Sequence, residues 1–209
     1  REFRKPAAGV EVLMVGCGNS ALSSEMHEAG YRKMINIDVA ASAVEKMATK
    51  FADLKGLQWQ VMDATAMEFE ADRFDLSVDK GTLDAMVSDF DGGGEVACAM
   101  VSEVWRTLKP GATFLLVSHN GKRLPLLDGA VSERFGEGAQ WEALEVRRCR
   151  LSAQATLINI LRSKLNGRPL AAAFKDPEML KEAAGETRKT LQQMQFLEAF
   201  RMFKAKKAR

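Results

Sequence analysis

Apolar and polar residues alternate in blocks along the first part of the chain, in the order expected when strands and helices follow one another. Short, mostly apolar runs are typical of strands that are covered on both faces of a sheet. Such runs lie at Val10–Val15, Met34–Ile37, Leu57–Met62, Phe74–Val78 and Ala112–Ser118. Apolar residues at helical spacing predict helices at Leu22–Ala29, Ser42–Phe51 and Glu95–Leu108. Ser42, with Glu45 three residues later, is expected to cap the second of these helices. This order predicts an α/β fold with a Rossmann-like, mostly parallel sheet and helices on both faces.

The pattern changes after the fifth predicted strand. Two stretches, Trp141–Arg150 and Ala155–Lys164, predict strands joined by a short turn, which are therefore antiparallel and bring the sheet to seven strands. Asp176-Pro177 is a typical helix start, with an acidic N-cap and proline at the first helical position. We expect that helix to run to about Lys207. The predicted organisation is a sheet domain over residues 1–166 and a helical C-terminal extension over 167–209.

The first strand ends in a glycine-rich turn, Gly16-Cys17-Gly18-Asn19-Ser20, and the second strand ends in Asp38. Glycine lets a backbone approach a ligand closely. A glycine turn followed about 20 residues later by an acid is the arrangement that binds a ribose in Rossmann-type sheets. Ala21 stands where dinucleotide-binding turns have a third glycine, which favours a nucleoside without phosphates.

Further polar residues follow the third and fourth strands. Asp63 is predicted either to accept from an adenine amino group, beside the donating Ala64 N–H, or to cap its own turn through Thr65. Asp79 opens the cluster Asp79-Lys80-Gly81-Thr82-Leu83-Asp84-Ala85, where it is placed to hold an amine, and Asp84 is placed to cap a short helix. Because the carboxyl ends of parallel strands share one sheet edge, we expect all these acids to meet there.

Composition narrows the class of protein. The 209 residues carry a formal net charge of +2, and the last nine hold five basic residues and no acid. We interpret these bases as a solvated helix end rather than a contact for RNA. No apolar run reaches the roughly 18 residues of a membrane span. The three scattered cysteines lack metal-ligand spacing and fit a reducing compartment, so we expect no metal and a cytoplasmic location.

The motifs Val12-Leu13-Met14-Val15-Gly16-Cys17-Gly18-Asn19-Ser20, Asn36-Ile37-Asp38, Met62-Asp63-Ala64-Thr65 and Asp79–Ala85 resemble those of the seven-β-strand S-adenosylmethionine-dependent methyltransferases. Within this class they look most like the methyltransferase-like 13 group, which methylates lysines of translation elongation factor 1A. The resemblance covers residues 10–118, and the GCGNS and DKGTLDA segments are its most specific parts.

The resemblance implies a role for each matching residue. Gly16, Gly18 and Asn19 would line the methionine and ribose part of S-adenosylmethionine. Asp38 would bind the ribose hydroxyls, Val39 would lie beside the adenine, and Asp63 with Ala64 would contact the adenine edge. Asp79 and Lys80 would lie near the methionine end and the target amine, as cofactor-binding and catalytic residues. The implied acceptor is a protein lysine, on elongation factor 1A or a similar substrate.

Two other functions remain open at this point. The basic C-terminal segment and the short stretch before the first strand are also compatible with a non-catalytic subunit of methyltransferase fold in a larger assembly. A small-molecule methyltransferase is the other alternative. An RNA adenine enzyme is disfavoured, because the loop after the fourth strand reads Asp-Lys-Gly-Thr and not Asn-Pro-Pro-Tyr.

Overall fold

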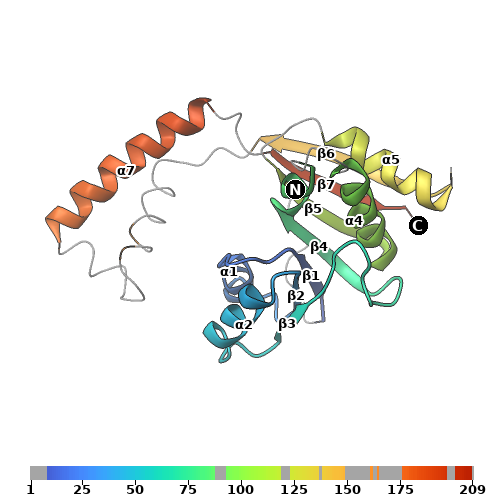
Figure 1. Cartoon of the computed structure of the whole chain (residues 1–209), viewed down its shortest axis with the longest axis horizontal. Helices are drawn as coiled ribbons and strands as arrows, with labels where there is room; N and C mark the ends of the chain where they lie inside the picture. Colours follow the sequence, from blue (N-terminus) through green and yellow to red (C-terminus); the bar gives the residue numbers. More distant parts are fainter. Residues whose placement is uncertain are drawn as a thin grey trace. The chain divides into compact units, whose positions relative to one another are not determined.

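A seven-stranded sheet with strand order β3-β2-β1-β4-β5-β7-β6 organises the fold (Figure 1). The computed structural model describes residues 9–87, 93–118, 123–136, 138–148, 161, 164, 176–196 and 201–208. The strands are β1 (Glu11–Val15), β2 (Lys33–Asp38), β3 (Leu57–Val61), β4 (Phe74–Lys80), β5 (Leu108–Ser118), β6 (Trp141–Arg148) and β7 (Arg201–Lys207). The helices are α1 (Leu22–Glu28), α2 (Ala41–Lys50), α3 (Thr82–Val87), α4 (Gly93–Thr107), α5 (Leu124–Phe135) and α7 (Pro177–Phe196).

Strand direction confirms the predicted Rossmann-like sheet. β1 pairs in parallel with both β2 and β4, β2 pairs in parallel with β3, and β4 pairs in parallel with β5. The last strand, β7, is antiparallel to β5. Val15 at the end of β1 lies opposite Ile37 on one side and Asp79 on the other. The carboxyl ends of these strands, with the polar residues that follow them, therefore share one edge of the sheet.

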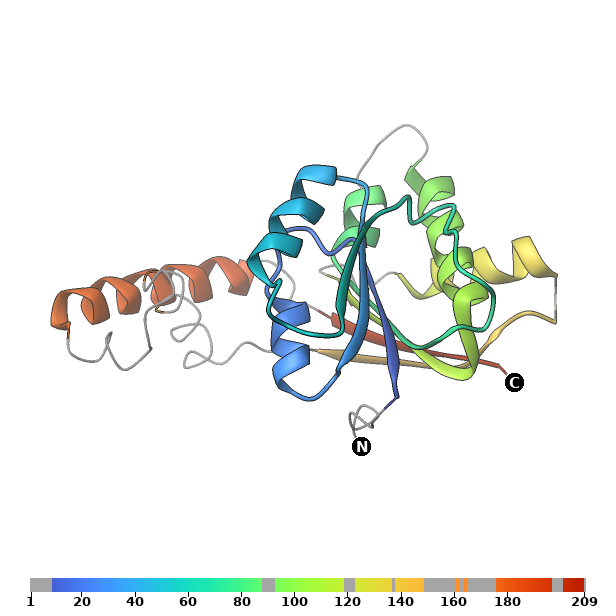
Figure 2. The same ribbon diagram turned by 90° about the horizontal axis from the view of Figure 1, so that it is seen from below.

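Both faces of the sheet are covered by helices, as the apolar strands require. Val12 and Met14 of β1 pack on one face in a cluster with Leu22 of α1. The alternate residues Leu13 and Val15 belong to the larger core on the other face, which contains buried residues of α4 and α5. Figure 2 shows α1 and α2 on one side of the strands and α4 and α5 on the other. Alternate residues of β1 thus pack against the helices on the two opposite faces of the sheet.

The C-terminal residues differ from the sequence prediction. The helix expected to reach Lys207 ends at Phe196, and Arg201–Lys207 forms β7. Ala205 pairs with Phe114 and is fully buried, so pairing with a distant strand decides the structure of this segment. The predicted N-cap is confirmed, since Asp176 Oδ1 accepts from the Met179 N–H at 3.0 Å.

The chain divides into two compact units, residues 1–147 with 201–209, and residues 148–200. The second unit contains α7 and therefore lies, in sequence, between β6 and β7 instead of following the sheet. The strand predicted at Ala155–Lys164 lies outside the described residues except for Leu161 and Lys164, which are helical. His119, which directly follows the fifth predicted strand, and Cys149, one of the three cysteines, also lie outside them. No helix in the described part of the chain has the length and apolarity needed to cross a membrane.

The start of α2 corrects a second prediction. Ser42 was expected to cap this helix, but the helix begins at Ala41 and its N-cap residue, Ala40, makes no side-chain cap. The Ala40 N–H instead donates to Asp38 Oδ1 at 2.9 Å. A side chain at the end of β2 thus takes the place of the local cap, which links the helix start to the ligand edge of the sheet.

Lys207 anchors β7, and its replacement gives a test of this strand. Its Nζ donates to the Leu108 carbonyl at 2.9 Å and to Asp72 Oδ1 at 2.6 Å, and lies 4.2 Å from the Trp105 ring centroid. Lys207→Met keeps the apolar stem but leaves a buried carbonyl without its donor. We expect a loss of about 2 kcal/mol in the free energy of unfolding, measured by urea denaturation.

Lys206→Met is the matched control. Lys206 is the neighbouring residue on the same strand, and its ion pair with Glu142 is exposed to solvent. Exposed pairs contribute little, so we expect a change of less than about 1 kcal/mol. Equal losses in both variants would contradict the anchoring role of Lys207.

Candidate functional site

The glycine turn after β1 adopts the backbone conformation that its glycines predict. Gly16 has φ +59° and Gly18 has φ +48°, in the left-handed region that side chains disfavour. Between them the Cys17 N–H donates to the Ile37 carbonyl at 3.0 Å, which ties the turn to the end of β2. A Cβ built on Gly18 would meet no atom within 4 Å. The turn therefore leaves open space directly over its backbone.

Asp38 lies where the sequence predicts it, at the end of β2 and against the glycine turn. Its Oδ2 accepts from the Gly18 N–H at 2.7 Å, while Oδ1 accepts from Ala40. Each carboxylate oxygen has two acceptor positions, so each has one left for a further donor. A ribose has two hydroxyls on adjacent carbons, and these supply one donor for each carboxylate oxygen. The contact with Gly18 also holds the carboxylate in place before any ligand binds.

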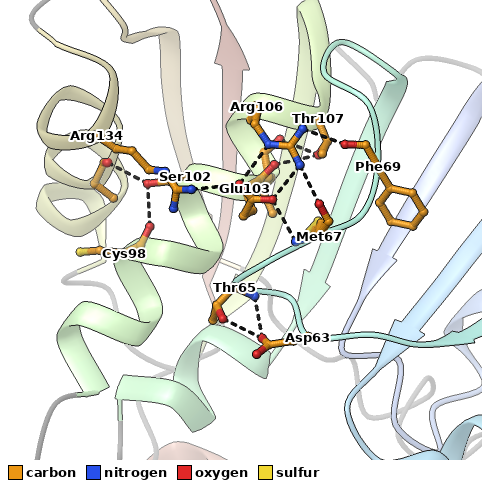
Figure 3. Close-up of polar contacts among 12 residues, drawn as sticks. Asp63, Thr65, Met67, Phe69, Cys98, Ser102, Glu103, Arg106, Thr107 and Arg134 are labelled. Carbon is orange, nitrogen blue, oxygen red and sulfur yellow. Dashed lines mark hydrogen bonds and ion pairs between the residues drawn. The ribbon is translucent and has the colours of Figure 1, made fainter.

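Asp63 follows β3 and is brought beside Asp38 by the sheet. The Met62 N–H donates to the Asp38 carbonyl at 3.0 Å, which joins the two strand ends. Asp63 Oδ1 accepts from both the N–H and the hydroxyl of Thr65, each at 2.8 Å (Figure 3). The capping alternative is therefore confirmed for Oδ1. Oδ2 accepts from no described residue, so a ligand contact by the same side chain stays a prediction.

Two cavities lie along this edge of the sheet. The larger, of about 560 Å³, falls within the range of small-molecule sites. Its lining includes the predicted residues Gly16, Asp38, Val39, Asp63, Ala64 and Lys80. The smaller, of about 240 Å³, is lined by the glycine turn, including Gly18 and Asn19, and again by Lys80. The structure thus gathers all but one of the predicted site residues around two cavities that share Gly16 and Lys80.

The predicted site residue outside both linings is Asp79. It is fully buried, and its two oxygens accept from the N–H groups of Thr82 and Leu83 at 2.7 and 2.9 Å. Asp79 therefore caps the N-terminus of α3 from the interior of the protein. Asp84, expected to be the cap, accepts instead from Ser118 and from Arg123. A buried cation, Arg123 just before α5, explains the exchange of roles, because a buried carboxylate needs a partner.

Burial raises the pKa of the Asp79 carboxyl to about 6, against the amide hydrogen bonds that lower it. The folded chain therefore keeps this proton between about pH 4 and pH 6, where the unfolded chain has lost it. We expect Asp79 to make the free energy of unfolding fall by about 2–3 kcal/mol as the pH rises through this range, and to add no slope above it.

Urea denaturation of the unaltered chain and of Asp79→Asn from pH 4.5 to 7.5 measures this effect. Asparagine has nearly the same shape and does not titrate, and the other acids contribute equally to both curves. The free energy of unfolding of the unaltered chain minus that of Asp79→Asn should therefore decline up to about pH 6 and then level off. A difference that does not depend on pH would contradict the shift.

Several lining residues were not identified from the sequence. Val96, Met86 and Ala85 contribute apolar surface to the larger cavity, and Thr82 lies at its edge. Thr82 joins the start of α3 to the end of β1, since its hydroxyl proton is shared between the Val15 and Gly16 carbonyls at 3.1 and 3.3 Å. The sequence signal for Thr82 was its place beside Gly81 in the motif, but its role depends on contact with Gly16, 66 residues away.

Cys17 lines the smaller cavity, and its thiol is held in the neutral form. Burial, with the nearby Asp38 charge, raises the pKa of the Cys17 thiol to about 12, which keeps it protonated. Within the described residues, no cluster of histidine, cysteine, aspartate or glutamate has the arrangement of a metal site. The chemistry offered here is that of a carboxylate pair, backbone N–H groups and one lysine around an open cavity.

Comparison with known proteins identifies relatives of the chain. A family model described as a methyltransferase domain matches residues 6–183. The chain is 41% identical over 109 residues to the eEF1A lysine and N-terminal methyltransferase of Danio rerio, a match that covers 52% of this chain and 16% of that protein. It is 34% identical over 117 residues to EEF1A lysine methyltransferase 4 of Mus musculus, covering 53% of this chain and 46% of that protein.

The fold has counterparts among solved structures. Phosphoethanolamine N-methyltransferase 2 of Haemonchus contortus, in complex with S-adenosyl-L-methionine, superposes with a TM-score of 0.60 at 16% identity. The superposition covers 96% of this chain and 49% of that one. At this identity the likeness supports the fold alone. The chain spans less than half the length of the two curated relatives described above.

Proposed function

We propose that this chain, which belongs to the methyltransferase domain family and uses S-adenosylmethionine as its cofactor, transfers a methyl group to a lysine side chain of a protein. The observation that carries the proposal is the pair of cavities at the strand ends, where the glycine turn, Asp38 and Asp63 converge. The lysine acceptor is supported by the two relatives named for that activity. Elongation factor 1A is the substrate we propose first.

The residues present fit the cofactor by their chemistry. The two remaining acceptor positions of Asp38 match the ribose hydroxyls, and Asp63 Oδ2 with the Ala64 N–H offers an acceptor beside a donor for an adenine edge. Val39 is 76% exposed although apolar, as expected of a surface that a flat ring covers. The open space above Gly18 suits the amino-acid end. We assign Gly16, Gly18, Asn19, Asp38, Val39, Asp63 and Ala64 to cofactor binding on these grounds.

The catalytic demand on the protein is small. The bound cofactor supplies a methyl group already activated on a sulfonium, so alignment with the acceptor is the main requirement. Holding two reactants in line lowers a barrier by about 7–11 kcal/mol. The acceptor lysine must be neutral to attack, and a desolvated site lowers the pKa of an amine.

Lys80 and Asp79 have different parts in this proposal. Lys80 lines both cavities, so its cation would disfavour a second ammonium nearby and thereby favour the neutral form of the acceptor. Asp79 was proposed from the sequence as a catalytic and cofactor-binding residue. In the structure it accepts hydrogen bonds from the backbone N–H groups of Thr82 and Leu83. Its effect on the reaction would therefore pass through the shape of the loop.

The proposal is tested by incubating the chain with methyl-labelled S-adenosylmethionine and purified elongation factor 1A, with peptide mass spectrometry to find the label. Label on a lysine side chain is the expected result. Label on the N-terminal amine would favour the second activity in the name of the Danio rerio relative. Cofactor binding with label only on a small molecule would favour a small-molecule methyltransferase.

An absence of turnover has its own interpretation. A chain that neither binds the cofactor nor labels any acceptor would be a non-catalytic subunit of methyltransferase fold. Co-purification with a stable complex would then support that alternative. A cytoplasmic location, expected from the cysteines, belongs to the same proposal and is checked by fractionation of cells that express the tagged chain.

A further inference from the structure

Glu103 of α4 is a buried carboxylate that belongs to neither cavity. Its side chain is 4% exposed, which is rare for glutamate unless a cation pairs with it. Arg106, one turn further along the helix, donates from Nε to Oε1 at 3.0 Å and from Nη2 to Oε2 at 2.7 Å. The pair has the two-pronged geometry that fixes orientation as well as charge. Figure 3 shows it facing the segment between β3 and β4.

Both members of this pair also bind the backbone of that segment. The Met67 N–H donates to Glu103 Oε2 at 2.9 Å. Arg106 donates from Nη2 to the Met67 carbonyl at 2.9 Å and from Nη1 to the Phe69 carbonyl at 2.7 Å. One ion pair therefore satisfies three backbone polar groups across a three-residue stretch.

The stretch needs these partners because it has no secondary structure of its own. Residues 62–73 connect β3 to β4 without forming a helix or a strand. Met67 and Phe69 are 5% and 7% exposed and pack into the larger core, so their own backbone polar groups lie close to it, where unpaired polar groups are costly. Glu103 and Arg106 supply the hydrogen-bond partners that a neighbouring strand would supply in a sheet.

The stretch held by the ion pair begins at Met67, two residues after Thr65 in the turn that contains Asp63. Two residues span at most about 7 Å of extended chain, so a shift of Met67 is transmitted to the turn with little slack. Asp63 and Thr65 bond each other, and the Ala66 N–H donates to the Asp63 carbonyl at 3.3 Å, so this turn moves as a unit. The start of the turn is held by Met62 at the end of β3, and its other end is therefore held from α4.

We propose that Glu103 and Arg106 are positioning residues that place Asp63 and Ala64 for the adenine end of the cofactor. The inference rests on the proposed use of that loop by the cofactor. A buried ion pair contributes little net stability compared with apolar residues of the same volume. What it provides here is a fixed geometry for the stretch from Met67 to Phe69, whose backbone it binds directly. Neither residue touches the ligand, so the effect falls on affinity and not on methyl transfer itself.

Arg106→Lys tests this role, with Arg134→Met as the matched control. Lysine keeps the charge but cannot reach Glu103 and two carbonyls at once. Arg134 contacts the same Glu103 carboxylate at 3.4 Å, is half exposed and makes no bond to the loop. We expect Arg106→Lys to weaken binding of S-adenosylhomocysteine by about tenfold in calorimetry, and Arg134→Met to change it by less than about twofold.

A shorter ligand locates the effect. Methylthioadenosine has the adenine and ribose but lacks the amino-acid end, so Arg106→Lys should weaken both ligands by the same factor. A loss confined to S-adenosylhomocysteine would place the effect at the glycine turn and overturn the proposal. Binding of both ligands at unaltered strength would overturn it as well.

Hydrogen exchange separates positioning from general destabilisation. In Arg106→Lys the amides of residues 64–69 should exchange at least about tenfold faster, while those of β1 stay protected. Faster exchange in β1 and β4 together with weaker binding would show a merely structural role and overturn the proposal. If the unaltered chain binds neither ligand, the proposed cofactor site itself fails, and this is seen before any variant is made.

Discussion

Replacing Asp38 with alanine is expected to weaken binding of S-adenosylmethionine by about 100-fold or more. The substitution removes both acceptors proposed for the ribose, and hydrogen bonds to a charged group contribute about 1.5–3 kcal/mol each. It also removes the contact that holds the Gly18 N–H at 2.7 Å, so the glycine turn loses its attachment to the end of β2. Two such contacts correspond to at least two powers of ten in the dissociation constant. Isothermal titration calorimetry on the purified chain measures the change.

Asp53→Ala is the control for charge and composition. Asp53 lies in the turn between α2 and β3, is exposed, and is absent from the lining of both cavities. We expect its replacement to leave the dissociation constant within about twofold, since exposed charges far from a ligand act weakly. Near-native affinity in a folded Asp38→Ala protein would mean that the ribose is not held at this strand end. The proposed role of Asp38 in cofactor binding would then be wrong.

The ligand edge was predictable because local sequence encodes it. Glycines in a tight turn, an acid at the end of the next strand and apolar strands between helices are each recognised from a short local stretch of sequence. Gly16, Gly18, Asp38 and Asp63 accordingly lie together around the cavities, as expected. Parallel topology then brings them to one edge without further information from side chains.

The seventh strand was not predictable in the same way. Arg201–Lys207 is rich in lysine and arginine and follows a helix, so its local pattern favours continuation of that helix. Its strand form depends on β5, more than 80 residues earlier, and on a buried Lys207 whose partners come from Asp72 and Leu108. A buried lysine has the same sequence signature as an exposed one.

The roles of Asp79 and Asp84 also depend on a residue that is distant in the sequence. Asp79 and Asp84 both precede or begin a short helix, and either satisfies the sequence rules for a cap. Arg123 decides between them, because it draws Asp84 into a buried pair and leaves the amides of α3 to Asp79. Glu103 and Arg106 likewise resemble an ordinary exposed helix pair three residues apart, and only the fold shows which loop they bind.

Gly16→Ala is expected to destabilise the domain by about 2–5 kcal/mol and to abolish cofactor binding at the temperature of the assay. Alanine at φ +59° costs about 1–2 kcal/mol in backbone strain. Its Cβ would also lie under 3.0 Å from the Oγ1, Cγ2 and Cβ atoms of Thr82. Such overpacking costs about 1–3 kcal/mol more. Thr82 has no room to yield, because its hydroxyl bonds Val15 and Gly16 and its N–H bonds Asp79.

Gly18→Ala separates the two contributions. Gly18 has the same left-handed backbone, with φ +48°, but a Cβ there meets no atom within 4 Å. Its replacement therefore carries only the backbone cost, and we expect a loss of about 1–2 kcal/mol in stability. Cofactor affinity should still fall, because the new methyl group occupies the space proposed for the amino-acid end. Thermal melts followed by circular dichroism distinguish the variants: a Gly16→Ala protein as stable as Gly18→Ala would mean that Thr82 does not support the turn, and that β1 and α3 are joined at the ligand edge by some other contact.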